Sequence, residues 1–444
     1  MRTRTARILK WTGAVVVASG VLYAVLLGLA NRSLRRAYSA LEADGRPMQP
    51  AEIVPPAIPG TENAALVYQA VVLQLKAEPA GEQDLFTTLG DLAAEMNKEP
   101  TNGERTARFR ELLQDSVVMD ALGALERGTK KPGCQYELDY SQGAGILLPH
   151  LSDLRQLTRI LCAVAHVQAA DGDHAGMWNT LITALRLANA VKDEPILVSQ
   201  LVRIAQFNLT VDTIHALAAA APSDEQYAEI STLLNSYDDN SPLVAAMDGE
   251  RVLLGEWVFG LPRSDLRQAA ALLGDGAVPA LAMACVFRPV FHFDHAAYLG
   301  VMHAYTRNAV EPYSEADAAL VEELLNNVPR YCVFTRILVP ALSQIKGRHF
   351  GMVARARITR AGLAALRYRR KHGAYPPSLA AVEARDFTDP FSGEPLIYRG
   401  APKGFAVYSV GMNLADDGGA PAEDGQSGDI IWRYAEEAGA EPAS

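Results

Sequence analysis

Hydrophobic and polar positions divide the chain into one uninterrupted apolar stretch and a long series of amphipathic segments. Residues 11–30 (WTGAVVVASGVLYAVLLGLA) contain no charged side chain. Twenty residues of α-helix span about 30 Å, the thickness of the hydrocarbon core of a bilayer. A helix in a soluble core normally keeps a polar stripe, and this stretch has none. We therefore predict one transmembrane helix, 11–30, preceded by a basic segment, 1–10.

The orientation of this helix in a membrane is only weakly specified. Basic residues flank it at Arg2, Arg4, Arg7 and Lys10 on one side and at Arg32, Arg35 and Arg36 on the other. The positive-inside rule is therefore nearly balanced. We expect the short N-terminal segment to stay in the cytoplasm and the bulk of the chain to be exported, on the periplasmic side. A cleaved signal peptide ending at 28–30 is the alternative, although the apolar run exceeds a usual signal core.

A linker and a long helical region follow. We interpret residues 31–60 as a juxtamembrane and Pro-rich linker, because residues 47–60 contain five prolines. From 61 to 346, apolar residues recur at helical spacing between short polar breaks, with Thr61 as the first expected N-cap. The clearest piece, 151–192, is a helix–Asp-Gly–helix hairpin that looks like a tetratricopeptide-type unit, with a plain αα-hairpin as the alternative. Other helices are expected at 196–220, 224–236, 242–259, 295–309, 315–326 and 330–346.

The pattern changes near residue 349. A helix over 349–372 ends before Gly373, and a short helix is expected at 377–384. Alternating residues then predict strands at 395–399, 405–409 and 429–433. The predicted fold class is mainly α: an N-terminal transmembrane helix, a helical bundle or array, and a small α+β module, 349–434, with a three-stranded antiparallel sheet. An acidic tail, 435–444, follows. The apolar run 277–287 is too short for a second span and is expected in the core.

The C-terminal module carries a family resemblance. The segments ALRYRRKHGAYPPSLAAV, DPFSGEP, GFAVYSVGMN and GDI occur in this order between residues 365 and 430. Together they resemble the C-terminal half of type II secretion major pseudopilins, which implies a pseudopilin-like head over about 349–433. The apolar helix differs from that family, because no leader ending in Gly-Phe precedes it and no glutamate enters it. We therefore interpret it as a tether.

The same resemblance implies a calcium site. In these pseudopilins the loop between the last strands binds calcium, and the matching loop here is 411–429. Calcium prefers six to eight hard oxygen ligands, which carboxylates on a pliable loop can supply. A solvated acidic loop without an ion is the alternative. The implied ligands are Asn413, Asp416, Asp417, Asp424 and Asp429.

Charge and composition narrow the function further. The formal net charge of −10 argues against a nucleic-acid binder. Cysteines at 134, 162, 285 and 332 form no CxxC pair, and we expect buried thiols. Residues 346–371 hold nine basic side chains and no acid. This basic helix either packs beside the acidic tail and neighbouring acidic helices or binds an anionic partner such as lipid headgroups. The surface in question comprises Arg355, Arg357, Arg360, Arg367, Arg369, Arg370 and Lys371.

Motifs for catalysis are missing: the chain has no GxxxxGK[ST], GxSxG or HExxH. His292, His295 and His303 form the one candidate zinc site, and a satisfied polar patch with Asp294 as N-cap is the alternative. We expect a membrane-tethered, non-enzymatic interaction or assembly protein of the cell envelope, with protein partners and a head related to secretion machinery. An envelope enzyme, such as a metal hydrolase, and a purely structural envelope component are the alternatives.

Overall fold

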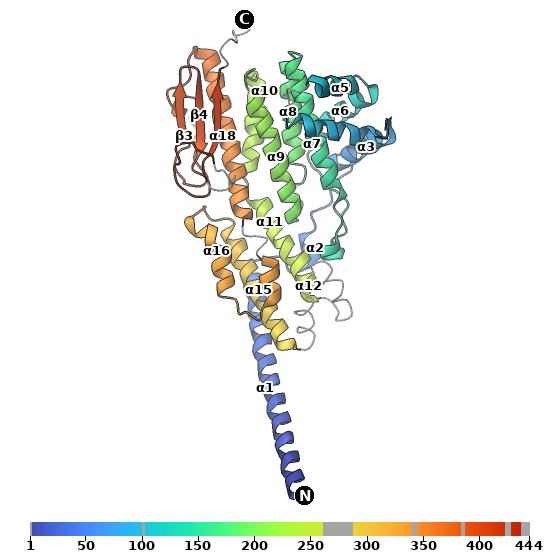
Figure 1. Ribbon diagram of the computed structural model, residues 1–444, viewed down its shortest axis with the longest axis vertical. Helices are drawn as coiled ribbons and strands as arrows, with labels where there is room; N and C mark the ends of the chain where they lie inside the picture. The colour runs from blue at the N-terminus through green and yellow to red at the C-terminus, as the bar shows by residue number, and fades with distance from the viewer. Residues whose placement is uncertain are drawn as a thin grey trace.

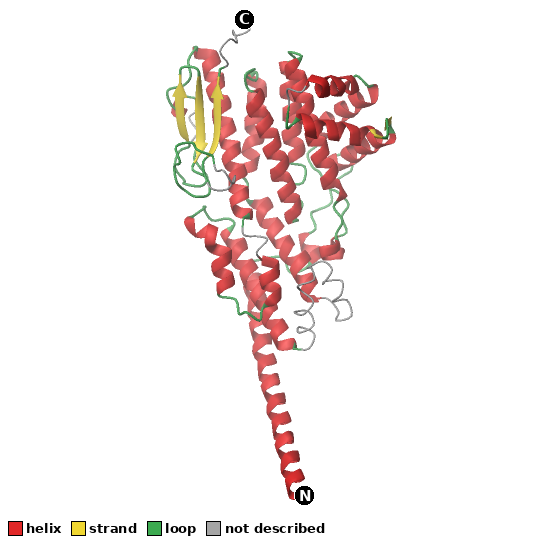
Figure 2. Ribbon diagram, in the orientation of Figure 1, coloured by secondary structure: helices red, strands yellow, loops and turns green. Residues whose placement is uncertain are grey.

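The computed structural model describes residues 2–99, 103–260, 287–339, 344–382, 387–421 and 428–436. Its longest element is α1 (Arg2–Ala43), with 42 residues and a length of about 63 Å. The apolar part of α1 projects from one end of an elongated helical body, and a small sheet lies near the opposite end (Figures 1 and 2). From Lys10 to Leu29 the helix is almost entirely exposed. By length and composition it is the one helix of the described residues that could cross a membrane, as predicted.

Helix α1 does not end where its apolar residues end. It continues through 31–43, the juxtamembrane part of the expected linker, because apolar side chains at helical spacing pack there against α15 (Arg288–Asn308). Ala30 and Leu41 are fully buried in this contact. Gly45 then adopts φ = +63°, a left-handed conformation that terminates the helix. Only the following residues run as a linker, interrupted by the single turn of α2 (Pro50–Ile53).

The centre of the body consists of antiparallel helices packed side by side along the long axis, and shorter helices lie across this axis at one side (Figure 1). Helix α7 (Pro149–Ala170) packs on α8 (His174–Ala188) and α9 (Leu197–Leu217), and the turn between α7 and α8 contains Gly172 at φ = +78°. The predicted hairpin at 151–192 is thus confirmed. The other helices are α3 (Ala64–Ala77), α4 (Leu85–Met96), α5 (Gly103–Leu113), α6 (Ser116–Thr129), α10 (Asp224–Asn235), α16 (Glu315–Asn326) and α17 (Val333–Leu338). Short elements are β1 (Pro79–Ala80), β2 (Gln83–Asp84), η1 (Tyr140–Gly145) and η2 (Ser236–Asp238).

The helix predicted at 242–259 contains a π-helical insertion. Helix α11 (Ser241–Gly249) passes directly into a π-helical segment, η3 (Glu250–Glu256), and then into α12 (Trp257–Gly260). Such insertions are rare and occur often at functional sites. Nothing in the apolar spacing of this region predicted it.

Four local predictions were wrong. The helix expected at 330–346 begins only at Val333, and the last two residues of that range, 345 and 346, already belong to the next helix, α18. The first helix of the body is capped by Asn63, not Thr61, because the Asn63 carboxamide accepts from the backbone N–H groups of both Ala65 and Gln135. Asp294 lies inside α15, which begins seven residues earlier than expected, and its carboxylate instead caps α17 through the N–H groups of Phe334 and Thr335. The short helix expected at 377–384 is a single 3₁₀ turn, η7 (Leu379–Ala381).

The C-terminal helix and sheet form as predicted. Helix α18 (Ile345–His372) ends at Gly373, whose φ is +75°. The antiparallel sheet has the order β3–β4–β5, with β3 (Ile397–Ala401), β4 (Gly404–Ser409) and β5 (Ile430–Ala435). Buried Asp389 links the preceding turn to the sheet, since its carboxylate accepts from Phe391 N, Val410 N and the Ser409 hydroxyl.

Helix α18 belongs to both the sheet and the bundle. One side packs on β4 and β5, and others pack on α9 and α10. The hydrophobic core therefore runs without a break from α8 and α9 through α18 to Phe405 and Trp432 of the sheet. The boundary expected near residue 349 divides the chain in sequence but not in its core. Among the cysteines, Cys162 and Cys332 are buried and Cys134 is half-buried; Cys285, like 277–286, lies outside the described residues.

The contact of α18 with the sheet requires a residue without a side chain. A Cβ on Gly362 would lie 2.1 Å from the ring of Trp432, whereas one on Gly351 of the same helix would meet nothing nearer than 3.8 Å. We expect Gly362→Ala to destabilise the protein by about 1–3 kcal/mol. Gly351→Ala, the control, should be neutral or stabilise by up to about 1 kcal/mol. Urea unfolding of the full chain in detergent measures both, and equal effects would contradict this packing.

Candidate functional site at the base of the body

Residues 31–44, the last part of α1 and its C-terminal turn, lie parallel to α15 and meet a row of three histidines. His292 Nδ1 lies 2.6 Å from Asn31 Oδ1, and His303 Nε2 lies 2.7 Å from Asp44 Oδ2. Between them, His295 Nε2 lies 3.4 Å from the Tyr38 hydroxyl. We call this contact between α1 and α15 the clasp. It gives each histidine its own partner within residues 31–44.

This arrangement separates the residues of the candidate zinc site. His295 and His303 stand eight residues apart on one helix, about 12 Å along its axis, whereas tetrahedral zinc holds its ligands about 2 Å from the metal. Within the described ranges, no group of three or more His, Cys, Asp or Glu side chains is arranged to hold a metal. The three histidines instead align α1 on α15.

The π-helical segment supplies the middle of the clasp. Tyr38 Oη donates to Glu256 Oε2 at 2.7 Å, and His295 Nε2 lies 3.4 Å from the same oxygen. The Phe259 ring stacks on the His295 ring at 4.3 Å between centroids, with 5° between the planes. Burial by itself would raise the pKa of Glu256. The hydrogen bond and charge interaction with His295, and the hydrogen bond from the Tyr38 hydroxyl, outweigh burial, so the pKa of Glu256 lies below its usual value. Glu256 is thus held as a carboxylate.

A second polar contact ties the end of α1 to the same segment. Arg251 is fully buried and donates through Nη2 to the Pro47 carbonyl, and Arg46 Nη1 donates to Asp248 Oδ2 at 3.2 Å. Glu250 lies in the same segment and is half-buried, and desolvation raises its pKa to about 7. The chain leaving α1 is therefore attached to the π-helical segment through Arg251 and to the end of α11 through Asp248.

Sequence reasoning found the three histidines but missed Tyr38, Glu256 and Arg251. Tyr38 lies 218 residues from Glu256 in the chain, and no motif joins them. The one available signal was Tyr38 itself, a polar aromatic residue on the apolar face that Leu34 and Leu41 define. Chemically, the clasp positions helices, and it exposes no nucleophile.

In the loop for which the resemblance implies a calcium site, the polar side chains form hydrogen bonds within the same module. Asp429 is buried and accepts from Gly419 N at 2.5 Å. Asp416 accepts from Gly418 N and the Tyr408 hydroxyl, and Asn413 donates to Asp417 at 2.8 Å. Asp424 lies outside the described residues. The structure thus brings Asn413, Asp416, Asp417 and Asp429 into one loop, where calcium binding stays a prediction.

The basic helix contacts acidic and polar groups of its own chain. These contacts match the interpretation in which the helix packs beside acidic neighbours, including Glu436 at the start of the tail. An anionic partner would have to compete with them. The contacts are Arg355 with Asp212, Arg357 with Asp238, Arg360 with Asn235, Arg369 with Glu436, and Arg367, Arg370 and Lys371 with Asp224.

Comparison of the chain with protein-family models, curated proteins and solved structures finds no match. The resemblance of 349–433 to pseudopilin heads therefore stays a prediction, and the function has to be argued from the geometry.

Removal of the Tyr38 hydroxyl tests the clasp. Tyr38→Phe takes a donor from a largely buried carboxylate, and hydrogen bonds to charged groups contribute about 1.5–3 kcal/mol. We expect the full chain in detergent to lose about 1–2 kcal/mol of stability in urea unfolding.

Tyr331→Phe is the matched control, because Tyr331 is 48% exposed and its hydroxyl bonds no described residue. It should leave stability unchanged. A Tyr38→Phe variant as stable as this control would show that the clasp is not a stabilising contact.

Proposed function

We propose that this protein is a membrane-tethered, non-enzymatic interaction or assembly protein that holds a helical scaffold at a fixed height above the bilayer. One observation carries the proposal: α1 passes without a break from its exposed apolar part into the clasp. A flexible linker at the membrane surface would let the body move freely. A continuous helix held by several polar contacts, most of them partly buried, fixes the body relative to its anchor.

Exposed apolar side chains on α3 support a protein partner. Leu66 and Leu73, 49% and 67% exposed, lie seven residues apart on the helix face opposite its buried residues. Met119 of α6, the helix that packs on α3, is 55% exposed. An outward helix face is normally polar, and clustered apolar side chains there are typical of interaction surfaces. These helices lie far from the exposed part of α1 (Figure 1). A partner bound to them would therefore meet the scaffold away from the bilayer.

The C-terminal sheet and α18 form the second surface of the scaffold. We propose, from the resemblance to pseudopilin heads, that this end faces envelope machinery on the periplasmic side. The arrangement of a long helix against a three-stranded sheet supports this proposal. The rigid attachment of α18 to the bundle would transmit its position to the whole body.

Site-specific photo-crosslinking in intact membranes tests the function. A benzophenone amino acid at position 66 or 73 should give a discrete adduct with another protein, since these positions lie on the proposed surface. The same probe at Glu322, an exposed residue of α16, is the control and should give none. Adducts of equal yield at all three positions, or at none, would contradict the proposal.

A further inference from the structure

Three arginines lie immediately beyond the apolar part of α1. Arg32, Arg35 and Arg36 are exposed and occupy the two turns that follow Ala30. The second turn of α15 lies at the same level, because His292 Nδ1 is 2.6 Å from Asn31 Oδ1. In a membrane-spanning chain, these arginines would therefore sit at the depth of the lipid headgroups.

No described carboxylate pairs with these arginines. Most of the described ion pairs in the body involve arginine, and they include the contacts along α18. Arg35 Nε reaches only the backbone carbonyl of Asn31, at 3.4 Å. Like charges three and four residues apart on a helix repel each other. An anion supplied from outside the chain would relieve that repulsion.

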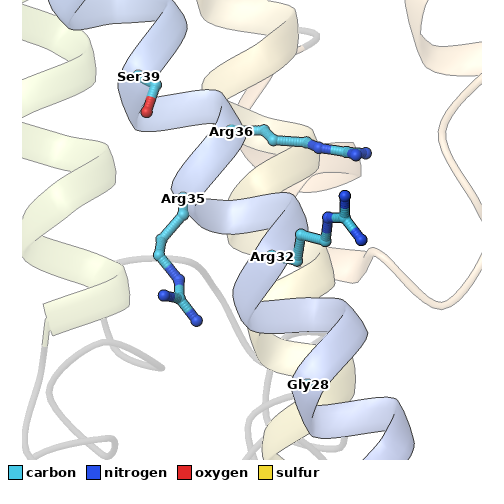
Figure 3. A pocket seen from close by; sticks show the side chains of 5 residues that line it. All are labelled: Gly28, Arg32, Arg35, Arg36 and Ser39. Carbon is cyan, nitrogen blue, oxygen red and sulfur yellow. The ribbon is translucent and has the colours of Figure 1, made fainter.

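The side chains line a shallow depression that is widely open to solvent. It has a volume of about 540 Å³ and is lined by Gly28, Arg32, Arg35, Arg36 and Ser39. Figure 3 shows Arg32 and Arg36 extending to one side of α1 and Arg35 to the other. Gly28 leaves room beside the helix, since a Cβ there would meet nothing within 4 Å. A phosphate could thus contact guanidinium groups while an acyl chain runs along the apolar helix below.

We propose that Arg32, Arg35 and Arg36 bind the phosphate groups of anionic phospholipids in the leaflet that faces the body. The proposal rests on the proposed tether, and it adds a specific ligand class. The formal charge of the whole chain is −10, so the attraction of anionic lipids is confined to these three arginines and does not extend over the body. Headgroup binding here, together with the clasp formed by the same turns of α1, sets the depth of α1 and the distance of the scaffold from the bilayer.

Native mass spectrometry of the full chain in a non-ionic detergent tests the site. Titration with phosphatidylglycerol should show binding about tenfold or more tighter than with phosphatidylcholine. The triple variant R32Q/R35Q/R36Q should lose this preference. The control R127Q/R155Q/R159Q removes the same charge from exposed arginines of α6 and α7 that pair with no described carboxylate, and it should keep the preference.

Equal retention of both lipids, or an undiminished preference in the triple variant, would overturn the proposal. So would displacement of phosphatidylglycerol by millimolar inorganic phosphate, which would assign the site to free phosphate. Alkaline carbonate extraction of membranes separates this failure from failure of the tether. If the chain stays in the membrane but shows no preference for anionic headgroups, only the lipid site is refuted. If the chain is released into the supernatant, the tether is refuted.

Discussion

The burial of polar groups where α1 enters the body is the constraint on which the rest of the structure depends. The same helix is apolar and exposed before Ala30. After Ala30, Asn31 and Tyr38 of the helix and Asp44, one residue past its end, contact α15. A buried polar group without a partner costs about 1–3 kcal/mol. The row of histidines and Glu256 Oε2 supplies partners for Asn31, Tyr38 and Asp44, and these contacts fix the register between α1 and α15, since a shift by one turn would separate every pair.

The π-helical segment η3 supplies further hydrogen-bond partners for this part of the chain. It brings Glu256 to Tyr38 and His295 while Arg251 reaches the Pro47 carbonyl after α1 has ended. Buried ionic groups seldom add much net stability, but they specify one arrangement against others. The clasp therefore contributes chiefly to the uniqueness of the contact between anchor and body, and apolar residues such as Leu41 and Leu299 supply the area that stabilises it.

At the other end, α18 connects the scaffold to the sheet. Its buried residues lie all around the helix over most of its length, so it cannot form a separate head without exposing one face. A displacement of the sheet would have to move α18, and with it α9 and α10. The core that α18 shares with the bundle ties the sheet to the helical body, and the clasp ties α1 to the same body at its other end.

Residue pattern alone determined the apolar helix, the hairpin of α7 and α8, the bounds of α10 and α16 to within a residue, and the three-stranded sheet. These features depend on local periodicity and turn residues such as Gly172 and Gly373, which act within a few positions. The tertiary structure decided that Asp294 caps α17 instead of its own helix, and that the basic side chains of α18 meet acids of other helices. It also decided that His292, His295 and His303 bind α1 and not one metal. Each depends on partners tens to hundreds of residues away, whose proximity no local pattern encodes.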